Sequence, residues 1–137
     1  MKTTELSHHD ILQILPDRAE DAHKGDFGKI LLLCGSCGYT GAAALAAMGA
    51  LCCGAGLVYL GVPECIYTIE AVKLNEPIVF SLPDADGTLS EEAVRKIAEM
   101  LPNMDAVLMG PGLGRSNGTF AVVKEVLRRF PGPVVLD

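Results

Sequence analysis

The feature that most constrains the fold is a regular alternation of short apolar segments with longer helix-forming ones. The apolar segments are bounded by glycine, proline or polar residues, which is typical of buried strands. The segments between them are rich in residues that favour helices. The predicted strands are residues 29–34, 57–62, 78–82, 105–109 and 133–136, and the predicted helices are residues 42–55, 64–73, 90–101 and 117–130. This alternation predicts an α/β fold whose mainly parallel sheet is covered on both faces.

The most apolar stretch, residues 41–60, could be mistaken for a membrane span. A buried helix followed by a buried strand explains it better, because interior elements of a parallel sheet are apolar on all sides. Cys52 and Cys53 in this helix are therefore expected to be small buried side chains. Residues 1–10 are polar and contain no apolar run of signal-peptide length.

Charge and cysteine content exclude several classes of function. The net charge is −6 and lysine and arginine are not clustered, which argues against binding to nucleic acid or to an anionic membrane. The five cysteines, without a secretory signal, indicate reduced thiols in the cytoplasm. Cys34 and Cys37 form a C-x-x-C, but Cys34 ends a predicted strand instead of starting a helix, so a redox role is not favoured. His8 and His9 have no partners at the spacing of a metal site.

Two glycine-rich segments follow predicted strands, at the ends where parallel α/β sheets bind ligands. Residues 35–42 (GSCGYTGA) lead from a strand into a helix, whose free N–H groups favour an anion such as phosphate. The G-x-x-G-x-x-G spacing matches neither the dinucleotide fingerprint nor a P-loop. A tight turn without a ligand is the alternative.

Residues 110–116 (GPGLGRS) form the second segment, in which three glycines and a proline fix an unusual backbone. Arg115 adds a charge that could pair with phosphate, and Ser116 or Asn117 could cap the next helix. Such a loop indicates a ligand site, with a purely structural loop as the alternative. Before the first strand, Lys24 is another candidate phosphate contact, although an exposed loop explains residues 23–28 (HKGDFG) equally well.

Several motifs occur together in one order. They are residues 23–28 (HKGDFG), 35–42 (GSCGYTGA), 50–62 (ALCCGAGLVYLGV), 110–115 (GPGLGR) and 133–137 (PVVLD). In this order the chain resembles the NAD(P)H-hydrate dehydratase family over about residues 16–137. The resemblance implies a ribokinase-like three-layer α/β/α sandwich, truncated after about five strands. It also implies that residues 1–137 are the N-terminal portion of a single domain, with residues 1–22 as a lead-in segment.

The resemblance carries a function with it. The family uses ADP or ATP, with Mg²⁺, to dehydrate the S form of hydrated NADH or NADPH. The nucleotide phosphorylates the ring hydroxyl, and phosphate then leaves. By position, Ala42 and Gly112 are expected to contact the hydrated dinucleotide, and Gly41 and Gly114 to shape the same cleft.

Two later motifs of the family, Thr-Pro-His-Pro-Gly-Glu and Gly-Thr-Gly-Asp, do not occur in these 137 residues. We therefore expect no catalytic residue and no metal ligand here, and no turnover by this chain alone. A chain that ends one residue after an apolar strand looks cut. The alternatives are a ribokinase-like kinase for a vitamin precursor, against which the glycine loops argue, and a non-catalytic nucleotide-binding protein. Apolar helices on an incomplete sheet also favour a homo-oligomer.

Overall fold

The computed structural model describes residues 5–15 and 18–137, and its centre is a five-stranded parallel sheet. The strand order is β3-β2-β1-β6-β7, and every neighbouring pair is parallel. The strands are β1 (Lys29–Leu33), β2 (Leu57–Pro63), β3 (Ile78–Leu82), β6 (Ala106–Met109) and β7 (Val134–Leu136). All five predicted strands are confirmed to within one residue at each end.

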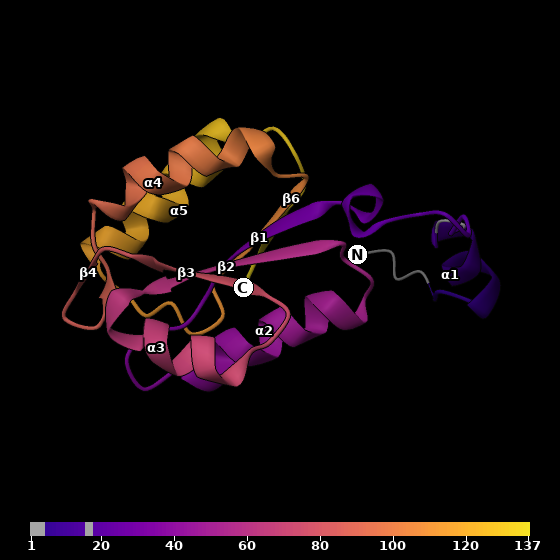
Figure 1. Ribbon diagram of the computed structural model, residues 1–137. Coiled ribbons are helices and arrows are strands. Elements are labelled where there is room, and N and C mark those ends of the chain that lie inside the picture. Colours follow the sequence, from indigo (N-terminus) through magenta and orange to yellow (C-terminus); the bar gives the residue numbers. More distant parts are fainter. Residues whose placement is uncertain (1–4, 16–17) are drawn as a thin grey trace.

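Four helices cover the sheet in two layers (Figure 1). They are α2 (Thr40–Cys52), α3 (Glu64–Lys73), α4 (Ala93–Met100) and α5 (Asn117–Arg129). Helices α2 and α3 pack on one face, and α4 and α5 pack on the other. The predicted three-layer α/β/α arrangement is confirmed, and it explains why the strands are continuous apolar runs.

Strand β1 shows how one short segment supplies both cores. Leu31 and Leu33 point into the core beneath α4 and α5, whereas Leu32 points into the core beneath α2 and α3. All three are 0% exposed. Side chains alternate between the two faces of a strand, so a strand that is covered twice must be apolar at every position.

The burial predicted for the helix in residues 41–60 is wrong. Only Ala43 and Ala47 of α2 are fully buried, while Leu45 is 76% exposed. Cys52 and Cys53 are exposed as well, because the helix ends at the molecular surface. Helix α2 lies in an outer layer, so only one side of it meets the sheet. Within residues 5–15 and 18–137, no helix is long and apolar enough to cross a bilayer.

Several short elements were not predicted. They are α1 (His8–Ile14), β4 (Asp84–Ala85), β5 (Thr88–Leu89), and the 3₁₀ helices η1 (Lys24–Phe27) and η2 (Leu101–Asn103). Strands β4 and β5 form a small antiparallel pair between β3 and α4. Helix α1 belongs to the predicted lead-in, of which residues 1–4 and 16–17 lie outside the described part. It has no buried residue and lies to one side of the sheet (Figure 1).

Candidate functional site

The two predicted glycine loops meet at the carboxyl edge of the sheet. One loop follows β1 and the other follows β6, and these strands are parallel neighbours. The Gly35 amide donates to the carbonyl of Pro111 at 2.8 Å, and the Ser36 hydroxyl donates to the carbonyl of Gly112 at 2.6 Å. Ser36 is only 3% exposed. These hydrogen bonds fix one loop against the other.

Gly112 lies directly against the turn that begins α2. A Cβ atom at Gly112 would lie 2.9 Å from the Cβ of Ala42 and 3.0 Å from that of Tyr39. Its φ of +68° is also a conformation that residues other than glycine rarely adopt. The structure therefore brings Ala42 and Gly112 into direct proximity, as their assignment to one site requires. Their contact with a ligand stays a prediction.

Gly114 and Arg115 follow Gly112 in the second glycine loop. Gly114 has a φ of +73°, and a Cβ there would lie 2.9 Å from Cγ2 of Thr88. Both residues are exposed and border a pocket of about 540 Å³. The pocket is lined by Tyr39, Gly110, Gly112, Leu113, Gly114, Arg115, Thr119, Val123, Leu136 and Asp137. Three predicted residues, Gly112, Gly114 and Arg115, thus share one concave surface between the N-cap of α2 and helix α5, whereas the predicted Gly41 and Ala42 do not line it.

The N-terminus of α2 is open. Tyr39 occupies the N-cap position and makes no side-chain hydrogen bond to the first turn. A Cβ atom at Gly41 would meet nothing within 4 Å. The first amides of a helix have no intrahelical acceptor, and the helix dipole adds partial positive charge there. The start of α2 is thus uncapped and open, and the binding of an anionic group there stays a prediction.

The N-terminus of α5 is closed by side chains of the protein. The Ser116 hydroxyl accepts a hydrogen bond from the Thr119 amide at 3.1 Å. It also lies 3.1 Å from the Thr119 hydroxyl and 3.4 Å from the carbonyl of Leu89. Of the two predicted caps, Ser116 fills the role, and Asn117 is the first helical residue.

Lys24 is not brought together with the other predicted site residues. It lies in η1, which precedes β1, whereas both glycine loops follow the strands. It lines a different pocket of about 780 Å³ at the amino edge of the sheet, together with Arg18 and Glu76. Sequence reasoning missed Arg18, which donates to the carbonyl of Gly54 at 3.3 Å and stacks over Phe27. No motif marks Arg18, so these contacts were not predictable.

The two thiols of the C-x-x-C differ in environment. Cys34 is buried and Cys37 is exposed. Burial, and then the negative charge of Asp137, raises the pKa of Cys34 to about 12. A neutral thiol is a poor nucleophile and a poor metal ligand, which agrees with the prediction of no redox role for this motif.

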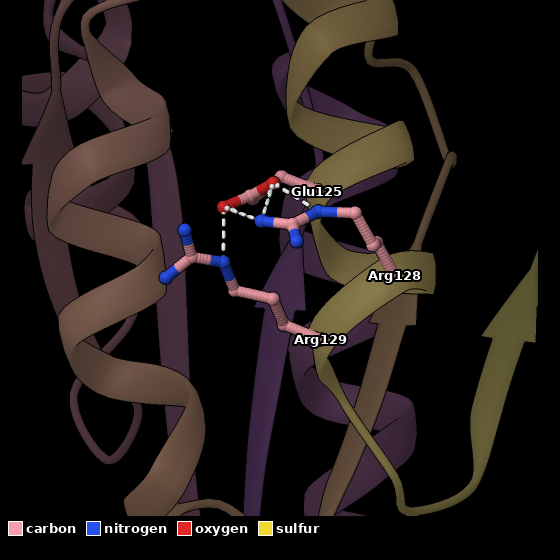
Figure 2. A network of polar contacts seen from close by, with 3 residues as sticks. All are labelled: Glu125, Arg128 and Arg129. Atoms are coloured by element: carbon pink, nitrogen blue, oxygen red, sulfur yellow. Dashed lines mark hydrogen bonds and ion pairs between the residues drawn. The ribbon is translucent and has the colours of Figure 1, made fainter.

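A polar network at the far end of α5 takes no part in this site (Figure 2). Arg128 contacts both carboxylate oxygens of Glu125, at 3.0 and 3.2 Å, and Arg129 pairs with the same carboxylate. Positive side chains in the last turn favour the helix dipole. Roughly 18 Å of helix separates Arg128 from Ser116. The network therefore stabilises the helix end.

Comparison with known proteins supports one family. A family model described as NAD(P)H-hydrate dehydratase matches residues 30–137. The chain is 44% identical over 124 residues to a bifunctional NAD(P)H-hydrate repair enzyme of Moorella thermoacetica, covering 90% of this chain and 23% of that protein. It is 39% identical over 121 residues to the enzyme of the same name from Dictyoglomus turgidum, covering 87% and 24%. The chain thus spans about a quarter of the length of these curated relatives.

Two solved structures have the same fold as this chain. An ADP/ATP-dependent NAD(P)H-hydrate dehydratase from Bacillus subtilis, co-crystallised with ATP and Mg²⁺, is 29% identical with a TM-score of 0.75. That match covers 96% of this chain and 44% of the other. A ribokinase-like superfamily protein from Enterococcus faecalis has a TM-score of 0.77 at 23% identity, covering 96% and 43%, and shows that the fold is ribokinase-like. Sequence and structure together place this chain in the NAD(P)H-hydrate dehydratase family.

Proposed function

We propose that this chain forms the dinucleotide-binding part of an NAD(P)H-hydrate dehydratase. The complete reaction would be the dehydration of the S form of hydrated NADH or NADPH, driven by ADP or ATP. The observation that carries the proposal is the contact between the open start of α2 and the Gly112 loop. An uncapped helix start beside a concave glycine surface suits a ligand that carries phosphate.

The residues of this chain would bind and orient the substrate. The first amides of α2, at Thr40 and Gly41, would donate to phosphate oxygens, and Arg115 would add a full positive charge. Gly41 and Gly112 would let the ligand approach the backbone closely, and Ala42 would form the floor between them. The nucleotide supplies the phosphoryl group that turns the ring hydroxyl into a better leaving group. Binding and orientation are therefore the tasks that this chain performs.

The described residues do not fit a Mg²⁺ ion held by the protein alone. Residues 5–15 and 18–137 contain no group of three or more His, Cys, Asp or Glu side chains that could hold a metal. Mg²⁺ is commonly bound through one or two carboxylates together with waters and substrate phosphates. We assign the Mg²⁺ and ADP or ATP of the reaction to the Thr-Pro-His-Pro-Gly-Glu and Gly-Thr-Gly-Asp motifs of the family, which do not occur in these 137 residues. Dehydration by the isolated chain is accordingly not expected.

Three further proposals rest on other features of the chain. The apolar side chains exposed on α2 and α3, among them Leu45 and Val72, favour a homo-oligomer, which analytical ultracentrifugation would detect. The five free cysteines fit a reducing compartment, and we place the protein in the cytoplasm. The family model for NAD(P)H-hydrate dehydratase matches residues 30–137, which argues against the alternative of a ribokinase-like kinase.

Binding tests the proposal without requiring turnover. Calorimetric titration of the chain with (S)-NADPH hydrate should give saturable binding, whereas ADP should give none. Gly112→Ala should weaken the dinucleotide by about tenfold or more, because the new methyl group displaces Ala42 and strains the backbone.

Gly54→Ala is the matched control for Gly112→Ala. Gly54 also has a positive φ, of +96°, but it lies at the amino edge of the sheet and faces the flexible end of Arg18. It should carry a similar backbone cost and leave the dissociation constant unchanged. Absence of dinucleotide binding by the folded wild-type chain would contradict the proposed function. Equal weakening by both variants would contradict the assignment of Gly112 to the site.

A further inference from the structure

A buried carboxylate lies outside the two glycine loops. Glu70 in α3 is 0% exposed, and no other acidic side chain in the described part of the chain is buried to this degree. Its Oε1 atom lies 3.3 Å from Nζ of Lys73, while Oε2 has no hydrogen-bond partner among the described residues. Removing a carboxylate from water is costly, and carboxylates are rarely fully buried without full pairing. Packing alone therefore does not account for Glu70.

Lys73 connects this carboxylate to the start of α2. Its Nζ atom donates to the Thr40 hydroxyl at 2.7 Å, a shorter contact than the one to Glu70. The Lys73 side chain is 38% exposed, whereas the Glu70 side chain is fully enclosed. A lysine side chain has many rotamers in solution, and a fixed carboxylate beside the ammonium group restricts them. Glu70 thus holds Lys73 in the orientation that reaches Thr40.

Thr40 is the first residue of α2 and precedes Gly41 and Ala42. Tyr39, at the N-cap, offers no side-chain hydrogen bond to this turn. The first turn of a helix lacks backbone acceptors for its own amides, so it opens easily unless another group holds it. The contact from Lys73 supplies such an anchor from a neighbouring helix, 33 residues along the chain.

We propose that Glu70 and Lys73 are positioning residues, which fix the first turn of α2 through the Thr40 hydroxyl. The proposal rests on the function proposed above, in which that turn receives the dinucleotide. The anchor lies on the α3 side of the turn, while Gly112 packs against Ala42. The turn is therefore held by other parts of the chain, and the amides of Thr40 and Gly41 stay available for a ligand, while the Ala42 amide donates to the carbonyl of Tyr39 at 3.3 Å.

A purely stabilising ion pair predicts a different outcome. Buried pairs add little net stability on average, because desolvation offsets their attraction. If Glu70 and Lys73 only stabilised the fold, breaking the link to Thr40 would leave the first turn of α2 as ordered as before. If they position the turn, breaking that link should loosen this turn while the rest of the chain keeps its stability.

Thr40→Val is the sharpest test, because it removes the hydroxyl and leaves Glu70 and Lys73 paired. Hydrogen exchange should become about tenfold faster at the amides of residues 43–46, whose acceptors lie in the first turn. The dissociation constant for (S)-NADPH hydrate should rise by about the same factor, the usual effect of losing a hydrogen bond to a charged group. Thr40→Ser keeps the hydroxyl and should restore both values. Unchanged exchange at residues 43–46 in Thr40→Val would overturn the proposal.

Lys73→Met tests the same link from α3, with Lys96→Met as its control. Lys96 also lies in a helix and also links it to another segment, but it donates to a backbone carbonyl, that of Ser81 at 2.9 Å, on the other face of the sheet. Lys73→Met should loosen the first turn of α2 as Thr40→Val does. The double variant Thr40→Val/Lys73→Met should exchange no faster at residues 43–46 than Lys73→Met alone. Lys96→Met should leave exchange at residues 43–46 unchanged, and equal loosening by Lys96→Met would overturn the proposal.

Exchange and binding separate the two proposals. If the wild-type chain does not bind the dinucleotide, the proposed function fails, yet exchange at residues 43–46 still decides whether Lys73 positions the turn. If the wild-type chain binds and Thr40→Val binds equally well with unchanged exchange, the positioning proposal alone fails.

Discussion

Helices α2 and α5 begin in the same way in the sequence and differently in the structure. Each follows a glycine loop at the carboxyl end of a central strand, and each has glycine as its second residue, Gly41 or Gly118. A Cβ atom at Gly118 would lie 2.1 Å from the carbonyl oxygen of Leu89. A Cβ atom at Gly41 would meet nothing within 4 Å. Gly118 is therefore required by the packing of the protein itself, whereas Gly41 leaves open space.

The caps differ in the same sense. The Ser116 hydroxyl closes the start of α5, while Tyr39 leaves the start of α2 without a side-chain cap. A helix N-terminus that is capped by side chains of the protein has a structural role, and one without a cap can bind an anion. This difference supports the proposal that phosphate of the dinucleotide binds at the start of α2.

The largest expected effect is on the closed side. Gly118→Ala should lower the free energy of unfolding by about 3 kcal/mol, because the methyl group would collide with the backbone at Leu89. Urea denaturation measures this change. Gly49→Ala in α2, where a Cβ meets nothing, is the control and should stabilise by up to about 1 kcal/mol. Equal stability of the two variants would contradict the closed packing at α5.

Loss of the cap should have a smaller effect. Ser116→Ala should cost about 1 kcal/mol, because the Thr119 amide loses its acceptor. Ser116→Asn offers a side-chain oxygen in the same place and should recover most of the loss. Thermal unfolding of both variants provides the measurement. A Ser116→Ala variant as stable as the wild type would show that α5 does not depend on this cap.

Much of this fold was predictable because its strands are buried on both faces. Continuous apolar runs such as residues 29–33 mark such strands directly. Strands β4 and β5 have two residues each, too few to show a period. The exposure of α2 was not predictable either, since a helix without charges has the same composition in a core and in an outer layer. Helix α1 was detectable in principle from the capping box of Ser7 and Asp10.

The candidate site was predictable only in part. The glycine spacing located both loops, but which strands are neighbours is a tertiary property, so the contact of Gly112 with Ala42 had to come from the structure. Lys24 precedes β1 and so lies at the opposite edge, which the element order already implied. The link between Lys73 and Thr40 spans 33 residues and leaves no local signal.

The smallest expected effect on the free energy of unfolding concerns Cys34, a thiol at the start of the loop before α2, and it develops above neutral pH. The folded protein keeps the Cys34 proton up to a pKa of about 12, whereas the ordinary value is 9.0. The folded state therefore binds more protons between these values, and the free energy of unfolding should fall as pH rises through this range. Urea midpoints at pH 7 and pH 10 should show this fall in the wild type and a smaller one in Cys34→Ala. An equal fall in both would contradict the burial of Cys34.

Exposed Cys37 should react with iodoacetamide in the folded protein, and Cys34 should not.

The most direct test of the account is the effect of Gly41→Ala on dinucleotide binding, measured beside Gly49→Ala. Both glycines lie in α2, and a Cβ at either would meet no protein atom within 4 Å. Neither variant should lose stability. The open start of α2 as the binding surface predicts that Gly41→Ala weakens (S)-NADPH hydrate by about tenfold, because the methyl group occupies space that the ligand needs, while Gly49→Ala binds as the wild type does. Equal affinity of both variants for the dinucleotide would contradict the assignment of the site to α2.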